Sequence, residues 1–354
     1  MLDNRLARVR ERMAAHGLEQ IIVTQPQGIY YLTGEWVEPH DRLDALVVTP
    51  EACRMLCYNL AVIEPEDCDV TIYTDTGETV PRLSALLEKR PTGVDGLMHS
   101  RFLLPLMALR PELRFAVSSC VEEARMYKEP DEIARLRNAS EVTDRVFAAA
   151  FARLQEGMTE LELGAVFSDC FAAEGVGRFH GDPMVCFGAG ASEPHHAPGN
   201  ARLRPGDTVM VDTGKRIDGY YSDMTRTVFF RSATDEQRRV YDIVLEANLA
   251  AIAAVKPGVP LADIHQAAAD VIARAGYGAY YPHRTSHGIG IDYHEEPFDV
   301  AGRRLPVEGN MCFSIEPGIY LPGRFGVRIE DLVVVTPEGC SLLNHAPKAF
   351  EVVR

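Results

Sequence analysis

The chain has 354 residues, 46% hydrophobic and 25% charged, a balance typical of a globular protein long enough to form two domains. The formal net charge of -15 argues against a partner bound through phosphate contacts, so no nucleic-acid partner is expected. No apolar stretch approaches the roughly 20 residues that a membrane-spanning helix needs, so no membrane partner is expected. The eight cysteines include no CxxC pair, which indicates reduced thiols in a cytoplasmic protein.

The first third of the chain alternates helical and strand patterns. Apolar residues at helical spacing predict an amphipathic helix near residues 3–16. The segments QIIVTQ (20–25) and DALVVTP (44–50) predict strands, and TVPRLSALLEKR (79–90) predicts a further helix. This alternation is typical of an α/β domain.

The pattern changes near residue 125, where we place a domain boundary between residues 1–125 and 126–354. Pro130 stands at a plausible first position of a long helix. The second domain is expected to be α+β, because hairpin strands are mixed with long helical patterns at about 131–155, 159–174, 235–255 and 261–275.

Two aspartates lie in strand-like runs of the segment VDTGKRIDGYYSDMTRTVFF (211–230). If the chain reverses at residues 217–219, where Asp-Gly supplies the turn, Asp212 and Asp223 lie opposite or diagonal on one sheet face. Two buried carboxylates side by side are destabilising and raise each other's pKa unless a cation compensates. A bound divalent metal is the simplest compensation.

A second hairpin repeats this arrangement. In CFSIEPGIYLPGRFGVRIEDLVVV, Glu316 and Glu330 are symmetrically placed around Gly323. Between the two hairpins, His287 is followed by two glycines in HRTSHGIGIDYHEEP and supplies a nitrogen ligand. Four carboxylates and one imidazole suit two adjacent divalent ions, roughly 3.5 to 4 Å apart, better than one structural zinc.

Other polar residues lie close to these acids in the sequence. Arg328 shares a sheet face with Glu330 and either reaches the pocket or holds a ligand carboxylate in an ion pair. Thr225 is a candidate hydroxyl partner behind the ligands, and Tyr220 either lines the pocket or packs in the core. Four further histidines are expected to be structural: His180, His196, His265 and His283.

With these motifs in order, the chain resembles the pita-bread metallopeptidases, in the proline-specific branch that contains Xaa-Pro dipeptidase (prolidase) and aminopeptidase P. The matching motifs are PHH, VDTG...GYYSDMTRT, HRTSHGIGIDYHEEP, FSIEPGIY and VRIED. The resemblance covers essentially the whole chain. It implies an α+β fold, with a pita-bread catalytic domain preceded by a smaller α/β domain of the creatinase type.

The resemblance also implies a role for each candidate ligand. Asp212 would bind one metal ion, His287 and Glu316 the other, and Asp223 and Glu330 would bridge the two. The carboxylate-rich donor set favours manganese, with cobalt and zinc as alternatives.

The implied reaction is hydrolysis of the Xaa-Pro bond in dipeptides or short peptides by a metal-bridging hydroxide. Glu316 would act as general base and pass the proton to the leaving nitrogen. His195 and His294 match family histidines that contact the substrate or stabilise the tetrahedral intermediate. The residues leave open whether the protein is a dipeptidase or an aminopeptidase.

Family members of this length are commonly homodimers in which one subunit's N-terminal domain reaches the other's active site. The segment TGEWVEPHDR, with Trp36, His40 and Arg42, is the candidate for that contact. The alternative is that Trp36 only packs within its own domain.

Several alternatives remain open. Metal-retaining relatives include non-peptide enzymes, such as ectoine-derivative hydrolases and dimethylsulfoniopropionate lyases, and some pita-bread proteins are inactive binding modules. The inactive modules typically lose ligands, whereas all five ligand positions are filled here. Two departures lie near the site: Ser286 where many members have glycine, and Tyr221 where a small residue is common. Either could narrow the pocket or change the substrate class.

Overall fold

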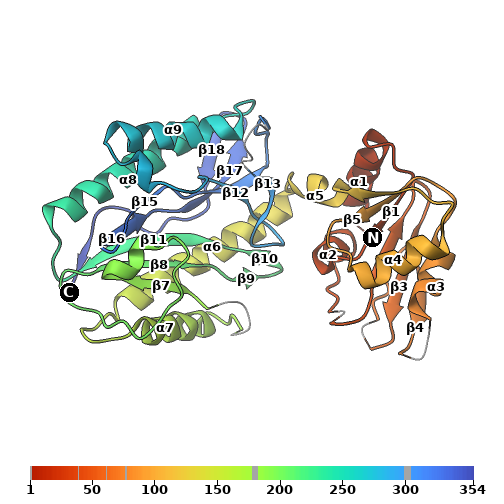
Figure 1. The fold of residues 1–354 in the computed structure, drawn as a ribbon, viewed down its shortest axis with the longest axis horizontal. Coiled ribbons are helices and arrows are strands. Elements are labelled where there is room, and N and C mark those ends of the chain that lie inside the picture. The colour runs from red at the N-terminus through yellow and green to blue at the C-terminus, as the bar shows by residue number, and fades with distance from the viewer. Residues whose placement is uncertain (1, 39, 61, 76–77, 178–181, 299–303) are drawn as a thin grey trace. The chain divides into compact units, whose positions relative to one another are not determined.

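The structure is a computed structural model that divides into two compact units, Met1–Arg125 and Met126–Arg354, each described by itself below (Figure 1). The residues that it describes are 2–38, 40–60, 62–75, 78–177, 182–298 and 304–354.

The described part of the first unit contains a six-stranded mixed sheet in the order β4-β3-β2-β1-β5-β6. Its strands are β1 Gln20–Val23, β2 Ala45–Val48, β3 Cys53–Tyr58, β4 Asp69–Tyr73, β5 Thr92–Asp95 and β6 Phe115–Ser118. Its helices are α1 Asp3–Ala15, α2 Pro26–Thr33, α3 Thr79–Leu86, α4 Ser100–Leu109 and α5 Cys120–Arg125. The strands β1, β2 and β3 pair antiparallel and the outer pairs are parallel, which confirms the expected α/β character.

The second unit has four long helices among its described residues: α6 Pro130–Phe151, α7 Glu160–Ala173, α8 Asp235–Ala254 and α9 Leu261–Arg274. These helices confirm the four helical patterns of the sequence. Threonine side chains cap the N-termini of α7 and α8. Thr159 and Thr234 each accept a hydrogen bond from the backbone N–H of the third residue of the helix that follows.

Among its described residues, the second unit contains two principal sheets, in the orders β19-β11-β8-β7 and β13-β12-β14-β17-β18. Their strands are β7 Met184–Phe187, β8 Thr208–Thr213, β11 Met224–Phe230, β12 His287–Gly288, β13 Glu295–Phe298, β14 Cys312–Ile315, β17 Asp331–Thr336, β18 Gly339–Leu342 and β19 Val352–Val353. Two small hairpins are β9 Arg216–Ile217 with β10 Tyr220–Tyr221, and β15 Gly318–Leu321 with β16 Phe325–Arg328. The short segments η1 Gly188–Ser192 and η2 Gly278–Tyr280 are 3-10 helices.

The helices form two pairs that bury different faces of these sheets (Figure 1). Apolar residues of α6 and α7 pack with Val185, Val209 and Val228 of the first sheet. Apolar residues of α8 and α9 pack with Phe313 and Val333 of the second sheet. The acidic hairpins therefore lie in the strand layer between two buried apolar regions. In the part of the chain that the structure describes, no helix is both long enough and apolar enough to cross a membrane.

The first acidic hairpin turns at Asp218–Gly219, where both residues have positive φ values of 50° and 86°. Strand β8 pairs antiparallel with β11 so that Thr225, rather than Asp223, faces Asp212. The aspartates are thus diagonal neighbours, one of the two arrangements expected. Gly214 makes this close crossing of the chain possible, because a Cβ at that position would lie 1.7 Å from the main-chain oxygen of Ser222.

The second acidic hairpin has the expected register. Gly318 pairs with Arg328 in the hairpin, and Ile315 pairs with Asp331 where the same two chain segments continue as β14 and β17. Glu316 and Glu330 lie between these two ladders at facing positions. The turn contains Gly323, whose φ of +69° lies in the left-handed region.

Candidate active site

The five candidate ligands lie in or directly beside different strands and line one cavity of about 550 Å³ in the second unit. Asp212 belongs to β8, and Asp223 immediately precedes β11. His287 begins β12, whereas the two glutamates lie in the breaks between β14 and β15 and between β16 and β17. The strand ladders therefore bring together residues that are more than 100 positions apart in sequence.

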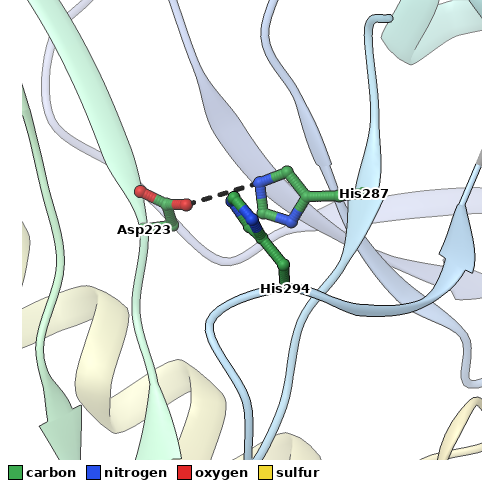
Figure 2. A group of neighbouring side chains, drawn as sticks. All are labelled: Asp223, His287 and His294. Carbon is green, nitrogen blue, oxygen red and sulfur yellow. Dashed lines mark ion pairs between the residues drawn. The ribbon is translucent and has the colours of Figure 1, made fainter. Parts of the chain in front are cut away.

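His287 lies in the middle of the group. Its Nε2 atom is 3.5 Å from Asp223 Oδ2, 3.6 Å from Glu316 Oε1 and 3.9 Å from Glu330 Oε1. Figure 2 shows the His287 ring and the Asp223 carboxylate pointing toward one another, with the His294 ring beside them. The other ring nitrogen, Nδ1, donates to the main-chain oxygen of Gly288 at 3.0 Å, so Nε2 is left facing the acids.

The donor atoms fall into two overlapping groups that share Glu330. One contains Asp212, Asp223 and Glu330, and the other contains His287, Glu316 and Glu330, with the ligand atoms of each group within 4.8 Å of one another. A third group joins Asp223 and His287 to His294. A carboxylate has two oxygens, so Glu330, which the first two groups share, and Asp223, which occurs in the first and third, are able to contact two ions, whereas His287 offers only Nε2.

Burial and mutual repulsion disfavour the charged forms of these acids. Burial and the nearby Asp212 raise the pKa of Asp223 to about 6, and burial raises the pKa of Glu316 to about 7. Burial and Asp223 together raise the pKa of Glu330 well above its usual range. Divalent cations bind to donor sets of this kind, in which several carboxylate oxygens lie close to one imidazole nitrogen. Two divalent ions would also balance the four negative charges.

Arg328 lines the cavity and forms an ion pair with Asp212, with 2.5 Å between Nη2 and Oδ2. Arg328 therefore both reaches the cavity and forms an ion pair with a candidate ligand, the two roles considered for it from the sequence. Thr225 lies behind the cavity, where its hydroxyl donates to Glu330 Oε2 at 2.7 Å and accepts from Arg328 Nε at 3.0 Å. The threonine therefore connects a candidate ligand with the arginine.

His195 and His294 both line the cavity, as expected for groups that contact a substrate. The centroids of the His294 and His287 rings are 4.1 Å apart. Burial and the nearby His287 lower the pKa of His294 to about 4, so its ring is neutral at physiological pH. A neutral imidazole can donate one hydrogen bond without repelling a bound cation.

Tyr220 does not line this cavity. Its side chain is buried, and its hydroxyl donates to Glu132 Oε1 of α6 at 2.9 Å. Tyr220 was expected either to line the pocket or to pack in the core, and in the structure it packs in the core. Tyr221 packs edge-on against Tyr293, with 5.5 Å between ring centroids, and Ser286 is buried directly before His287.

Three of the histidines expected to be structural bind polar neighbours. His196 Nε2 is 3.0 Å from Glu160 Oε2, and His265 Nδ1 is 2.7 Å from the Thr285 hydroxyl. His283 also lines the cavity, where its Nε2 is 2.8 Å from the Tyr320 hydroxyl. His180 lies outside the described residues.

Sequence reasoning missed several residues that support the site. Tyr293 lines the cavity and donates its hydroxyl to Asp223 Oδ1. Lys128 forms a buried ion pair with Glu295, with 2.7 Å between Nζ and Oε1, which anchors the segment that carries Tyr293 and His294. Tyr293 stands inside a recognised motif and could have been found there. No local pattern links residue 128 to residue 295.

In the first unit, the candidate contact segment makes local interactions. The Trp36 indole donates to Glu38 at 3.1 Å and packs edge-on against Tyr30. Arg42 forms ion pairs with Asp41 and Asp75, and His40 has a positive φ of 53°. A contact of these residues with a second subunit stays a prediction.

Two segments of the chain match known protein families. Residues 134–337 match metallopeptidase family M24, and residues 5–145 match the creatinase/prolidase N-terminal domain. These matches confirm the pita-bread fold preceded by a creatinase-type domain. An uncharacterised peptidase of Staphylococcus aureus strain USA300 is 36% identical over 331 residues, which cover 92% of this chain and 94% of that protein.

Solved structures are similar to this one over nearly the whole chain. A prolidase from Thermococcus sibiricus has a TM-score of 0.91 and 30% identity, covering 100% of this chain and 99% of its own. Dipeptidase PepE from Mycobacterium ulcerans has a TM-score of 0.88 and 33% identity, covering 99% and 97%. The chain therefore belongs to metallopeptidase family M24 and is a metallopeptidase.

Proposed function

We propose that the protein hydrolyses the Xaa-Pro peptide bond of dipeptides or short peptides with two divalent metal ions. The observation that carries the proposal is the convergence of four acids and one imidazole in two overlapping groups that share Glu330. The similarity to a prolidase at 30% identity over the full chain supports proline as the residue after the cleaved bond.

The proposed ligand assignment follows the family resemblance. Asp212 would hold one ion, His287 and Glu316 would hold the other, and Asp223 and Glu330 would contact both. In support of this assignment, Glu330 falls in one group with Asp212 and in another with His287 and Glu316. When bound, such ions lower the pKa of a coordinated water toward about 7 and polarise the scissile carbonyl. The oxygen-rich donor set favours manganese, with cobalt or zinc as alternatives.

The protein's own groups manage the proton and the developing negative charge. Glu316 lines the cavity and can accept a proton from the attacking water and pass it to the leaving nitrogen. The leaving nitrogen must gain a proton, as in the hydrolysis of any peptide bond. His195 and His294 line the same cavity and supply donors for the tetrahedral oxyanion.

The test compares metal-free and manganese-reconstituted protein on Ala-Pro, Gly-Pro, Ala-Pro-Ala and Ala-Ala. We expect two bound ions per chain by mass spectrometry and metal-dependent cleavage of Xaa-Pro substrates but not of Ala-Ala. Asp223→Asn should abolish activity, whereas Asp242→Asn changes an exposed helical aspartate and should not. Absence of peptide cleavage by protein that holds two ions would overturn the proposal and favour a non-peptide substrate.

We further propose a homodimer, on the basis of the family resemblance. Light scattering of the purified protein tests this, and a single 39.1 kDa species at micromolar concentration would contradict it.

A further inference from the structure

Tyr293 lies in the loop between β12 and β13, directly before His294. Its side chain lines the cavity, and its hydroxyl donates a hydrogen bond to Asp223 Oδ1. Two other rings pack against it. The Tyr221 ring packs edge-on with 5.5 Å between centroids, and the His287 ring lies nearly parallel, with centroids 6.4 Å apart and an angle of 23° between planes. The hydroxyl therefore reaches Asp223 from a ring whose orientation is held by its neighbours.

The two oxygens of Asp223 face different parts of the candidate metal site. Oδ2 is 3.5 Å from His287 Nε2 (Figure 2), whereas Oδ1 accepts the hydrogen bond from Tyr293. Asp223 also falls in one group with Asp212 and Glu330. Because Oδ2 faces the imidazole, Oδ1 is the oxygen that remains for an ion bound together with Asp212. A carboxylate oxygen has two lone pairs, so Oδ1 can accept from Tyr293 and still bind that ion.

Both acids proposed to contact two ions accept a hydrogen bond from a neutral hydroxyl. Glu330 Oε2 accepts from Thr225 at 2.7 Å, and Asp223 accepts from Tyr293. Asp212, proposed to contact one ion, is instead paired with a charged arginine. A neutral donor orients a carboxylate and leaves its negative charge in place, so the carboxylate keeps its attraction for two cations. The Tyr293 hydroxyl is therefore suited to support a shared ligand.

We propose that Tyr293 is a positioning residue that holds Asp223 Oδ1 toward the ion bound with Asp212, called here the Asp212 ion. This inference rests on the proposed two-ion site and goes beyond it, because it assigns Tyr293 to one of the two ions. The other ion, bound with His287 and called the His287 ion, contacts the oxygen that Tyr293 does not touch. Hydrogen-bond partners of metal ligands typically contribute about 10 to 100-fold in metal affinity. Loss of the Tyr293 hydroxyl should therefore weaken the Asp212 ion and spare the His287 ion.

The first test measures metal binding and needs no turnover. Calorimetric titration of metal-free wild type with manganese should give two bound ions. Tyr293→Phe keeps the ring and its packing, and it should raise the Kd of one ion by about 10 to 100 times while the Kd of the other stays the same. Tyr221→Phe is the matched control, because it removes a hydroxyl from the adjoining ring and Tyr221 is not among the described residues that line the cavity. The control should change neither Kd.

Two single-ion backgrounds identify which ion is affected. Asp212→Asn leaves the His287 ion, and adding Tyr293→Phe to it should not change the Kd of that ion. His287→Ala leaves the Asp212 ion, and adding Tyr293→Phe to it should raise the Kd by about 10 to 100 times. A residue that only stabilised the fold would weaken both ions alike. Thermal melts of the metal-free variants, followed by circular dichroism, check that each variant folds like its parent.

The outcomes separate the two proposals. If wild type binds two ions and Tyr293→Phe binds both with unchanged Kd, the assignment of Tyr293 is wrong and the peptidase function stands. An equal loss in both single-ion backgrounds would also overturn the assignment. If Tyr293→Phe has the expected effect but wild type with two ions cleaves no peptide, the proposed function fails and the role of Tyr293 stands. Wild type that binds fewer than two ions would overturn both.

Discussion

Asp331 lies at the centre of a buried charge network behind Glu330. Its carboxylate is 2.7 Å from Arg226 Nη2 and 2.6 Å from Lys348 Nζ, and the Asp331 side chain is only 1% exposed. Arg226 also donates to the main-chain oxygens of Glu330 and Ala346. The substitution Asp331→Asn keeps the shape of the side chain and removes its charge, so it tests the network directly.

The expected cost can be estimated in two ways. Two hydrogen bonds between charged groups contribute about 1.5 to 3 kcal/mol each. Removing one partner of a buried ion pair costs about 3 to 5 kcal/mol, because the remaining charge stays buried. Both estimates indicate a loss of about 4 kcal/mol in the free energy of unfolding. At about 2 to 4 °C per kcal/mol for a unit of this size, Asp331→Asn should lower Tm by about 8 to 16 °C.

Urea unfolding followed by far-ultraviolet circular dichroism measures this loss. The control is Asp242→Asn, which breaks an exposed ion pair with Arg238 on α8 and should cost less than about 1 kcal/mol. If Asp331→Asn costs no more than the control, the buried network does not stabilise the second unit and the reasoning fails.

Three further outcomes are expected. Chelation should lower Tm because the crowded acids lose their counter-charge, and added manganese should restore it by mass action; an unchanged Tm after verified metal removal would contradict this. Thr225→Val removes the hydroxyl that binds Glu330, so its Kd for the metal should be about 10 to 100 times that of wild type. Competition with a fluorescent chelator measures this Kd, and an unchanged value would show that Thr225 does not support the metal ligand. Burial lowers the pKa of His196, but Glu160 and Glu193 outweigh it and the net pKa is raised. The contribution of protonated His196 to the free energy of unfolding is therefore complete below pH about 6.5 and is lost as the pH rises through the raised pKa. The stability difference between wild type and His196→Gln should shrink from pH 6 to pH 9. A constant difference would count against this ion pair.

The strand registers account for most of what the sequence could predict. A turn centred on Gly323 requires Glu316 to face Glu330, and the ladders on either side of these residues keep that register. The first hairpin was less well specified. Its turn contains only Asp218 and Gly219, so Asp212 and Asp223 are diagonal rather than opposite. A local pattern fixes which residues share a face, whereas the turn type fixes the exact partners.

The supporting residues were harder to predict because they come from distant segments. Lys128 and Glu295 pair across 167 positions, and neither residue stands in a pattern that names the other. The choice between two roles for Tyr220 also needed coordinates, because the side chain points to Glu132 on α6. Such contacts depend on how whole helices pack on the sheets, which no short segment determines.

The short strand β19 has a practical consequence for handling the protein. Val352 and Val353 pair with Phe229 and Phe230 of β11, the strand that also carries Thr225, and they cover the edge of that sheet. Trimming these residues would leave unpaired N–H and C=O groups along a buried apolar strand, a template for association between copies of the chain. Proteolysis that removes Val352 and Val353 should therefore appear first as aggregation.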